Sequence, residues 1–305
     1  MGCEINADRI VILEEQIKQH EKIMFGLKRS RNSLLNVSTL PPEVLSSIFC
    51  WNMTLDEPFD GLKERPYNFL LVCHHWFEVA SRTPELWAFW GNNLEHWEER
   101  HLRSSVGVPL DLVLNERLED TYDSFSESQR VALEDRAARD TVRRLHICSD
   151  SDHLTTSVIS PLLSPRGGLR TNNLESLILR SEDPIPVDVS FLAHSHLPKL
   201  RHLELDNWTV SSWDHLASQG KLLTTLALLR ADFVPRPTMP QILSMLASNL
   251  HLRTLVLEPD TIPNDDDGLS FRMPLYHLED LQLKGDVGQV VALLRRIEHP
   301  QEWTN

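Results

Sequence analysis

The chain has 305 residues, of which 41% are hydrophobic and 24% charged, with a formal net charge of −14. A chain of this length holds more than one typical domain and has enough apolar side chains for a sizeable core. The excess negative charge argues against a nucleic acid or an anionic membrane as the main partner, because their phosphates would be repelled over most of the surface.

The cysteines, Cys3, Cys50, Cys73 and Cys148, are far apart and form no C-x-x-C pair. This spacing supports neither a disulfide framework nor a zinc module. No apolar run approaches the ~20 residues that span a bilayer, and the N-terminus lacks the apolar core of a signal peptide. We therefore expect reduced thiols, no membrane association, and a cytoplasmic or nuclear protein.

Residues 5–34 have the charge and apolar spacing of a long helix, which we take as a separate N-terminal segment, residues 1–35. Two positions of a heptad recur along it, one through Ile10, Ile17, Met24 and Arg31 and the other through Leu13, His20, Leu27 and Leu34. Such a seam is typical of a coiled-coil dimer. A single helix that lies along the next domain or projects into solvent is the favoured alternative, since His20 and Arg31 interrupt the seam.

Two helices are predicted between residues 40 and 87. The first begins at LPPE, where the proline pair suits a first turn, and runs to about Phe49 with Val44, Leu45, Ile48 and Phe49 in one apolar stripe. The second runs over Phe69–Ala80 and has an apolar stripe of its own. The chain then turns at Thr83-Pro84 and returns Leu86 and Trp87 to both helices.

Residues 36–90 resemble the F-box of fungal F-box proteins in three motifs that occur in the same order: LPPEVLSSIF, a helix with the pattern V-C-x-x-W-x-x-V-A, and T-P-x-L-W. We take residues 36–100 as the corresponding domain. The resemblance implies that this all-helical module docks on the Skp adaptor subunit of a cullin-RING ubiquitin ligase. The residues at the matching contact positions are Leu40, Pro41, Pro42, Glu43, Leu45, Ile48 and Phe49. The sequence departs from the family at His74 and His75, where basic residues are common, and in a longer insertion at residues 51–68.

A Trp-rich helix is predicted over residues 88–103, and a charged helical excursion over residues 116–141. From Pro109 onward an L-x-x-L-x-L pattern recurs, and Leu110, Leu112 and Leu114 alternate like an earlier strand. The second leucines or equivalents of its copies are Leu145, Leu177, Leu203, Leu226, Leu255 and Leu281, spaced by 32, 26, 23, 29 and 26 residues. Helices are expected between strands at residues 213–218, 239–247 and 287–297.

These spacings resemble those of leucine-rich repeats. The resemblance implies an α/β fold in which residues 105–300 form an irregular solenoid, with parallel strands on one face and helices on the other. The family's asparagine, three residues beyond the last leucine, is absent, and Trp208 stands there in the third copy.

No motif for catalysis or cofactor binding was found. The sequence has no Walker A motif, no G-x-G-x-x-G, no G-x-S-x-G and no H-E-x-x-H, and its histidines are scattered. Adjacent acids such as Glu14-Glu15 point in different directions on a helix, so they do not face each other across a cleft. We expect no enzyme activity, no cofactor and no metal.

If the leucines of each strand point into the solenoid, the residues between them face outward on the sheet. This alternation predicts a partner-binding face with an apolar centre and charged edges. Its predicted contact residues are His146, Ile178, Arg180, Glu204, Ala227, Leu229, Val256 and Gln282. A mixed surface without a partner, or a face covered by another segment of the chain, is the alternative.

The sequence therefore favours a non-enzymatic adaptor, in which the F-box binds the Skp subunit and the repeats bind a protein substrate. The alternative is an interaction scaffold whose degenerate F-box engages no ligase. A third hypothesis, an enzyme with an unfamiliar site on the sheet face, would have to use His146, His202, Glu204 and Asp206.

Overall fold

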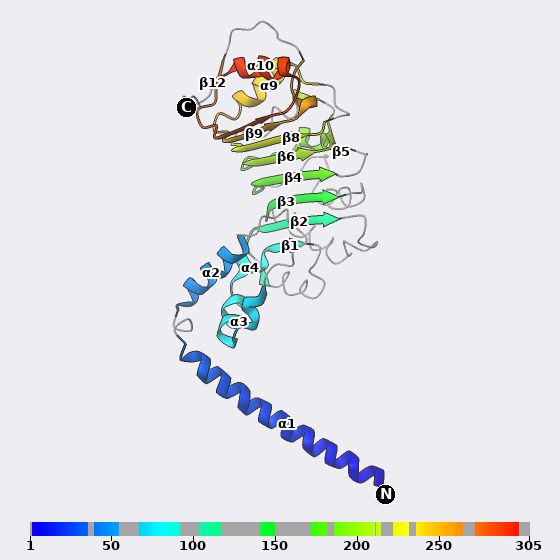
Figure 1. The fold of residues 1–305 in the computed structure, drawn as a ribbon, viewed down its shortest axis with the longest axis vertical. Helices are drawn as coiled ribbons and strands as arrows, with labels where there is room; N and C mark the ends of the chain where they lie inside the picture. The colour runs from blue at the N-terminus through cyan, green and yellow to red at the C-terminus, as the bar shows by residue number, and fades with distance from the viewer. Residues whose placement is uncertain are drawn as a thin grey trace. The chain divides into compact units, whose positions relative to one another are not determined.

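The computed structural model describes residues 2–35, 40–54, 67–91, 104–105, 107–116, 141–149, 172–181, 186–210, 212–214, 222–231, 236–264 and 272–298. The chain divides into two compact units, Met1–Leu86 and Trp87–Asn305. Most of the helices and strands are labelled in Figure 1.

The first unit is helical. It contains α1 (Gly2–Ser33), α2 (Pro42–Thr54), the 3-10 helix η2 (Tyr67–Leu71) and α3 (His74–Ser81), and α4 (Pro84–Trp87) begins at its end. The predicted N-terminal helix is confirmed as one unbroken helix (Figure 1). Helix α2 begins where predicted but continues five residues beyond Phe49, to Thr54.

The single helix predicted over Phe69–Ala80 is wrong, because the structure divides it into η2 and α3. Cys73 lies between them in an extended conformation, with φ −162° and ψ 167°. The break lets η2 bury Phe69 and Leu70, while Val72 remains exposed. In a continuous helix, Val72 would lie on the same face as Phe69 and would be buried with it. Because η2 buries the consecutive residues Phe69 and Leu70 instead, tertiary packing overrides the helical periodicity of the sequence here.

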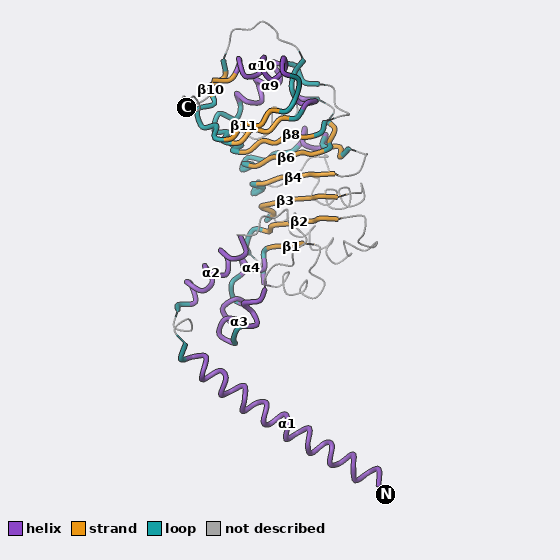
Figure 2. The backbone as a smooth tube through the Cα atoms, viewed as in Figure 1, coloured by secondary structure: helices purple, strands orange, loops and turns teal. Residues whose placement is uncertain are grey.

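The second unit is built on a parallel sheet of eight strands that follow one another in chain order, β1-β2-β3-β4-β6-β8-β9-β11 (Figure 2). The strands are β1 (Phe89–Gly91), β2 (Leu110–Glu116), β3 (Val142–Ser149), β4 (Ser176–Ser181), β6 (His202–Asp206), β8 (Thr225–Leu229), β9 (Thr254–Leu257) and β11 (Asp280–Leu283). The sheet and its helices confirm the predicted α/β class, and β2 confirms the strand predicted at Leu110–Leu114.

The helix predicted over residues 88–103 is wrong where the structure describes it, since Phe89–Gly91 forms strand β1. Phe89 is paired with Asp111 of β2, and the Asp111 amide donates to the Ala88 carbonyl at 2.7 Å. Aromatic side chains suit a strand, and the free edge of β2 supplies backbone partners that a helix would not use. The sheet therefore begins inside the predicted domain 36–100. Residues 92–103 lie outside the described residues.

The repeated leucines form the core of the sheet unit. In the first five copies all three pattern positions are buried, as with Leu174, Leu177 and Leu179. In the last copy Leu278 is buried but Leu281 and Leu283 are only half-buried. Strand β11 is at the edge of the sheet, so its leucines have a neighbouring strand on one side only.

Two helices complete the second unit near its C-terminal strands (Figure 1). Helix α9 (Met239–Ala247) matches the predicted residues 239–247, begins at a capping box formed by Thr238 and Gln241, and buries five apolar side chains. Helix α10 (Val287–Arg296) begins at Asp286, whose carboxylate accepts from the Gly288 amide at 2.8 Å.

Shorter elements connect these parts: β5 (Val187–Asp188), η3 (Ser190–His194), β7 (Trp208–Thr209), η4 (Pro259–Thr261), β10 (Met273–Pro274) and β12 (Ile297–Glu298). Most of the excursion predicted at 116–141 lies outside the described residues, as do residues 215–218 of the helix predicted at 213–218. Within the described part of the chain, no helix is long and apolar enough to cross a membrane.

Candidate functional site

The beginning of α2 is fixed by its own sequence. The Pro41 carbonyl accepts from the amides of Val44 and Leu45 at 3.0 and 3.1 Å, which closes the first turn. Pro42 lacks the amide hydrogen that a first helical position leaves unbonded, and Glu43 places a negative charge near the positive end of the helix dipole. The segment Leu40–Glu43 therefore enters the helix in one defined conformation.

One side of α2 belongs to the core of the helical unit. Leu45, Phe49 and Met53 are buried. The Phe49 ring stacks on Phe69 of η2 with centroids 4.6 Å apart, and its centroid lies 5.2 Å from that of Trp76 in α3. Such aromatic pairs add roughly 0.5–1.5 kcal/mol each to the burial itself. Phe49 therefore joins the three helical segments of the unit.

The other side of α2 is an apolar surface open to solvent. The side chains of Val44, Ile48 and Trp51 are 44%, 47% and 71% exposed. Their i, i+4, i+7 spacing aligns them in one stripe, which we call the α2 stripe. Isolated exposed apolar residues are common, but three in one stripe on a short helix form a candidate protein-binding surface.

The structure divides the predicted adaptor-binding residues into two groups. Pro41, Pro42, Glu43 and Ile48 are exposed, and Leu40 is half-buried. Leu45 and Phe49 lie in the core, where they present no surface to a partner. The prediction treated the four apolar residues as one buried stripe, whereas the helix divides them between two faces.

Sequence reasoning missed Val44 and Trp51 as surface residues. The spacing of Val44, Ile48 and Trp51 was visible, but it lies next to the spacing of Leu45, Phe49 and Met53. A helix that is apolar over such a wide arc does not reveal by periodicity which half is buried.

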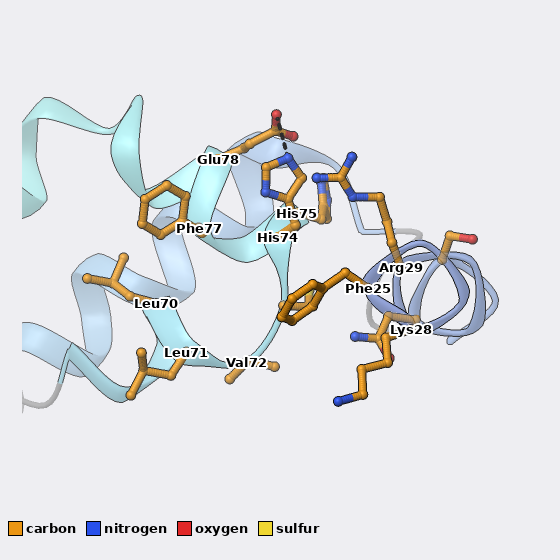
Figure 3. Close-up of a pocket in the computed structure, with 13 residues that line it drawn as sticks. Phe25, Lys28, Arg29, Leu70, Leu71, Val72, His74, His75, Phe77 and Glu78 are labelled. Carbon is orange, nitrogen blue, oxygen red and sulfur yellow. Dashed lines mark ion pairs between the residues drawn. The ribbon is translucent and has the colours of Figure 1, made fainter. Parts of the chain in front are cut away.

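A pocket of about 830 Å³ lies between the C-terminal part of α1 and the η2–α3 segment (Figure 3). Phe25 of α1 points toward the chain at Val72, and Leu70 and Phe77 add further apolar lining. This wall of aromatic and aliphatic side chains suits an apolar group.

The polar lining of the pocket includes two side chains that carry positive charge. Lys28 and Arg29 come from α1, and His74 pairs with Glu78 at 3.2 Å on the exposed surface of α3. The buried Nε2 atom of His75 has no hydrogen-bond partner among the described residues. The pocket therefore combines an apolar wall with polar and charged side chains.

On the sheet of the second unit, the residues between the leucines are in register from strand to strand. The central row runs His146, Ile178, Glu204, Ala227, Val256 and Gln282. The next row toward the strand ends contains Cys148, Arg180, Asp206 and Leu229. The predicted contact residues thus lie together on the sheet, in two adjacent rows.

The prediction that these residues are surface-exposed is wrong for the centre of the face. His146, Ile178, Glu204 and Ala227 are buried, whereas Gln282 at the β11 edge and Arg144 near the beginning of β3 are exposed. Neighbouring strands lie about 4.8 Å apart, so side chains of one row pack against each other. Of the predicted residues, Arg180, Leu229 and Val256 are half-buried and Gln282 is exposed.

The buried His146 is bonded to a neighbouring strand. Its Nε2 lies 2.7 Å from the Ser176 hydroxyl oxygen, and the side chain is only 4% exposed. Burial, reinforced by the nearby His202 and Arg144, lowers the pKa of His146 to about 3. The imidazole is therefore neutral at physiological pH.

Ion pairs connect successive strands near their carboxyl ends. Arg180 binds Glu204 at 2.5 Å and Arg230 binds Asp206 at 2.5 Å. Burial by itself would raise the pKa of Glu204, but the nearby His202 and Arg180 outweigh it and hold that pKa below its ordinary value. Glu204 and Asp206 are thus each already engaged by an arginine.

Burial limits the chemistry of several polar side chains among the described residues. Ser176 and His146 are within hydrogen-bond distance, but both are buried. Burial, and to a lesser extent Glu85, raises the pKa of the Cys50 thiol, which keeps it protonated. Within the residues that the structure describes, no three His, Cys, Asp or Glu side chains lie close enough to hold a metal ion.

Comparisons of the chain with protein-family models, with curated proteins and with solved structures give no match.

Proposed function

We propose that the chain is a substrate-recruiting adaptor of a Skp-cullin-F-box ubiquitin ligase. In this proposal the segment from Leu40 to Leu86 is an F-box that docks on the Skp subunit. The second unit is an irregular leucine-rich-repeat solenoid that binds a protein substrate. The transfer of ubiquitin belongs to other subunits of the ligase.

The observation that carries the proposal is the α2 stripe next to the exposed Pro41, Pro42 and Glu43. The proline pair and its acidic neighbour belong to the motif that resembles the F-box. A partner that covers Ile48 and Trp51 would remove two large apolar side chains from water at the centre of a small interface. Large apolar anchors of this kind dominate the binding energy of most interfaces.

The sheet unit supports the second half of the proposal. Its strands follow one another in chain order with the leucines inside, as expected when each repeat stacks on the previous one. One accessible part of the face lies toward β11, where Leu229 and Val256 are half-buried and Gln282 is exposed. We propose that a substrate contacts this end of the face.

The adaptor role is tested by measuring the affinity of the purified full chain for the Skp subunit of its own organism. In the variant Ile48→Asp, Trp51→Asp, two charges lie in the contact, and each anchor lost from such a contact costs on the order of 2 kcal/mol. The affinity should fall at least thirtyfold. Val11→Asp is the matched control, because Val11 is an exposed apolar residue of α1 in the same unit.

Circular dichroism of both variants checks that their helices are retained. Equal binding by the control and the double variant would refute a contact through the α2 stripe. If the folded wild-type chain binds no Skp subunit, the adaptor role is wrong and a scaffold that engages no ligase becomes the better account.

A further inference from the structure

Helix α1 exposes an apolar seam that is interrupted by His20 and Arg31. The seam consists of the heptad positions Ile10, Leu13, Ile17, Met24 and Leu27 of α1, which are 44–68% exposed, and of Leu34, which directly follows the helix and is 83% exposed. With His20 and Arg31 included, the seam positions recur at alternating intervals of three and four, the spacing by which two helices pack side by side. An apolar stripe of this length on a soluble helix marks an interaction surface.

The helix turns a different side toward its own unit. The α1 residues that line the pocket are Phe25, Lys28, Arg29, Asn32 and Ser33. At 100° per residue, their mean direction lies roughly 150° around the helix from the seam positions of the same turns. The side of α1 that lines the pocket is therefore not the side that carries the seam. Helix α1 can contact its own unit through the pocket residues and a partner through the seam at the same time.

The seam has the composition that favours a second identical helix. Its first heptad position carries the β-branched Ile10 and Ile17, and the complementary position carries Leu13, Leu27 and Leu34. β-branched residues at the first position with leucine at the second favour parallel two-stranded coiled coils. The Ile10–Leu13 heptad satisfies both parts of this rule, and Ile17 and Leu27 satisfy one part each.

The flanking charges agree with a parallel arrangement. In a parallel pair, each residue that flanks the seam on one side faces the residue five positions later in the other copy. Arg9 would then face Glu14, Gln16 would face Glu21, and Ile23 would face Lys28, so no like charges meet. The antiparallel arrangement that pairs Ile17 with Leu27 instead brings Glu21 against its own copy.

From these observations we propose that α1 forms a parallel, in-register coiled coil with α1 of a second copy of this chain. His20 and Arg31 then lie against their own counterparts inside the seam. Polar layers of this kind weaken a coiled coil but fix its register, so the dimer dissociates reversibly. The proposal does not depend on the adaptor role, since it concerns another face of another helix.

Sedimentation equilibrium of the full chain, from 1 to 100 µM, tests the dimer. The wild-type chain should be dimeric at the upper concentrations. Ile17→Asp with Leu27→Asp should make it monomeric throughout, whereas Val11→Asp with Ile12→Asp, two exposed positions off the seam, should leave the dimer unchanged.

Replacing a polar layer by an apolar one should strengthen the dimer, and a misfolded variant would not show this result. His20→Leu replaces one of the two polar layers by an apolar one and should lower the dissociation constant of the dimer at least tenfold. The proposal is overturned if the wild-type and His20→Leu chains are both monomeric at 100 µM. It is also overturned if the seam variant dimerises as well as the off-seam control, because another surface then holds the two copies.

The orientation is tested by oxidation of Leu27→Cys in a chain that also carries Cys3→Ser. In a parallel pair the introduced thiols are adjacent, so a disulfide-linked dimer should form that the Cys3→Ser parent does not form. A linked dimer that appears only when Ile17→Cys and Leu27→Cys chains are mixed would instead establish the antiparallel arrangement and refute the parallel one. The monomeric seam variant should still bind the Skp subunit. Loss of the dimer and loss of Skp binding can therefore be observed separately, and each bears on one proposal only.

Discussion

Acid should weaken the sheet unit through a single histidine. His146 is 4% exposed, and its pKa is lowered to about 3 from an ordinary value of 6.5. Because the native state holds this group neutral, the unfolded state binds more protons below pH 6.5. Stability is therefore fully present above that pH and is lost as the pH falls toward 3. At pH 5 the difference of 1.5 pH units from 6.5 corresponds to ~2 kcal/mol of lost unfolding free energy.

Urea unfolding at pH 7 and pH 5, followed by circular dichroism, measures this loss. The wild-type chain should lose ~2 kcal/mol more between the two pH values than His146→Gln, whose side chain has no proton to gain. His251→Gln is the control, since His251 is exposed on the same unit. The pKa of Glu204 is lowered, so its contribution falls below pH 4.5 and does not enter this comparison.

The reasoning is refuted if wild type and His146→Gln show the same dependence on pH. An NMR titration gives an independent check, because the His146 ring signals should not shift between pH 8 and pH 5 while the protein is folded. A midpoint near 6.5 for these signals would mean that the ring is accessible to solvent and that the sheet face is more open than described.

Two further predictions concern the stability of each unit. Phe49→Ala removes the ring that stacks on Phe69 and should lower the unfolding free energy by ~3–5 kcal/mol, whereas Val11→Ala at an exposed position of the same unit should change it by less than ~0.5 kcal/mol, both measured by urea unfolding. Asn249 is buried, accepts from the Leu223 amide at 3.2 Å and donates to the Met245 carbonyl at 2.9 Å. Asn249→Ala should therefore cost ~1–3 kcal/mol by leaving that amide unbonded, and an unchanged urea midpoint would contradict this role.

The architecture of the second unit could be predicted because its signal is repeated. Each L-x-x-L-x-L copy states the same alternation, so the strand positions and the register followed from the leucines alone. Strand β1 was missed because Phe89 and Trp90 stand outside that pattern. Aromatic residues suit both helices and strands, and only the open edge of β2 decides between them.

The site was less predictable than the fold. The alternation of apolar and polar residues predicts on which side of a strand a residue lies. It does not predict whether neighbouring side chains bury that residue. His146 and Glu204 lie on the predicted face, yet they are enclosed by the residues of adjacent strands. Likewise, the composition of α2 does not reveal that Phe49 is in the core while Trp51 is exposed, since that difference depends on where η2 packs.

The central claim is that the α2 stripe is the surface on which the Skp subunit docks. The most direct test is hydroxyl-radical footprinting of the full chain while the Skp subunit is added in increasing amounts. Trp51 is 71% exposed, so it should be oxidised readily in the free chain and become protected in proportion to the bound fraction. Exposed residues of the same unit outside the stripe, such as Val11, should keep their oxidation rates. Unchanged oxidation of Trp51 at saturating Skp subunit would contradict the account.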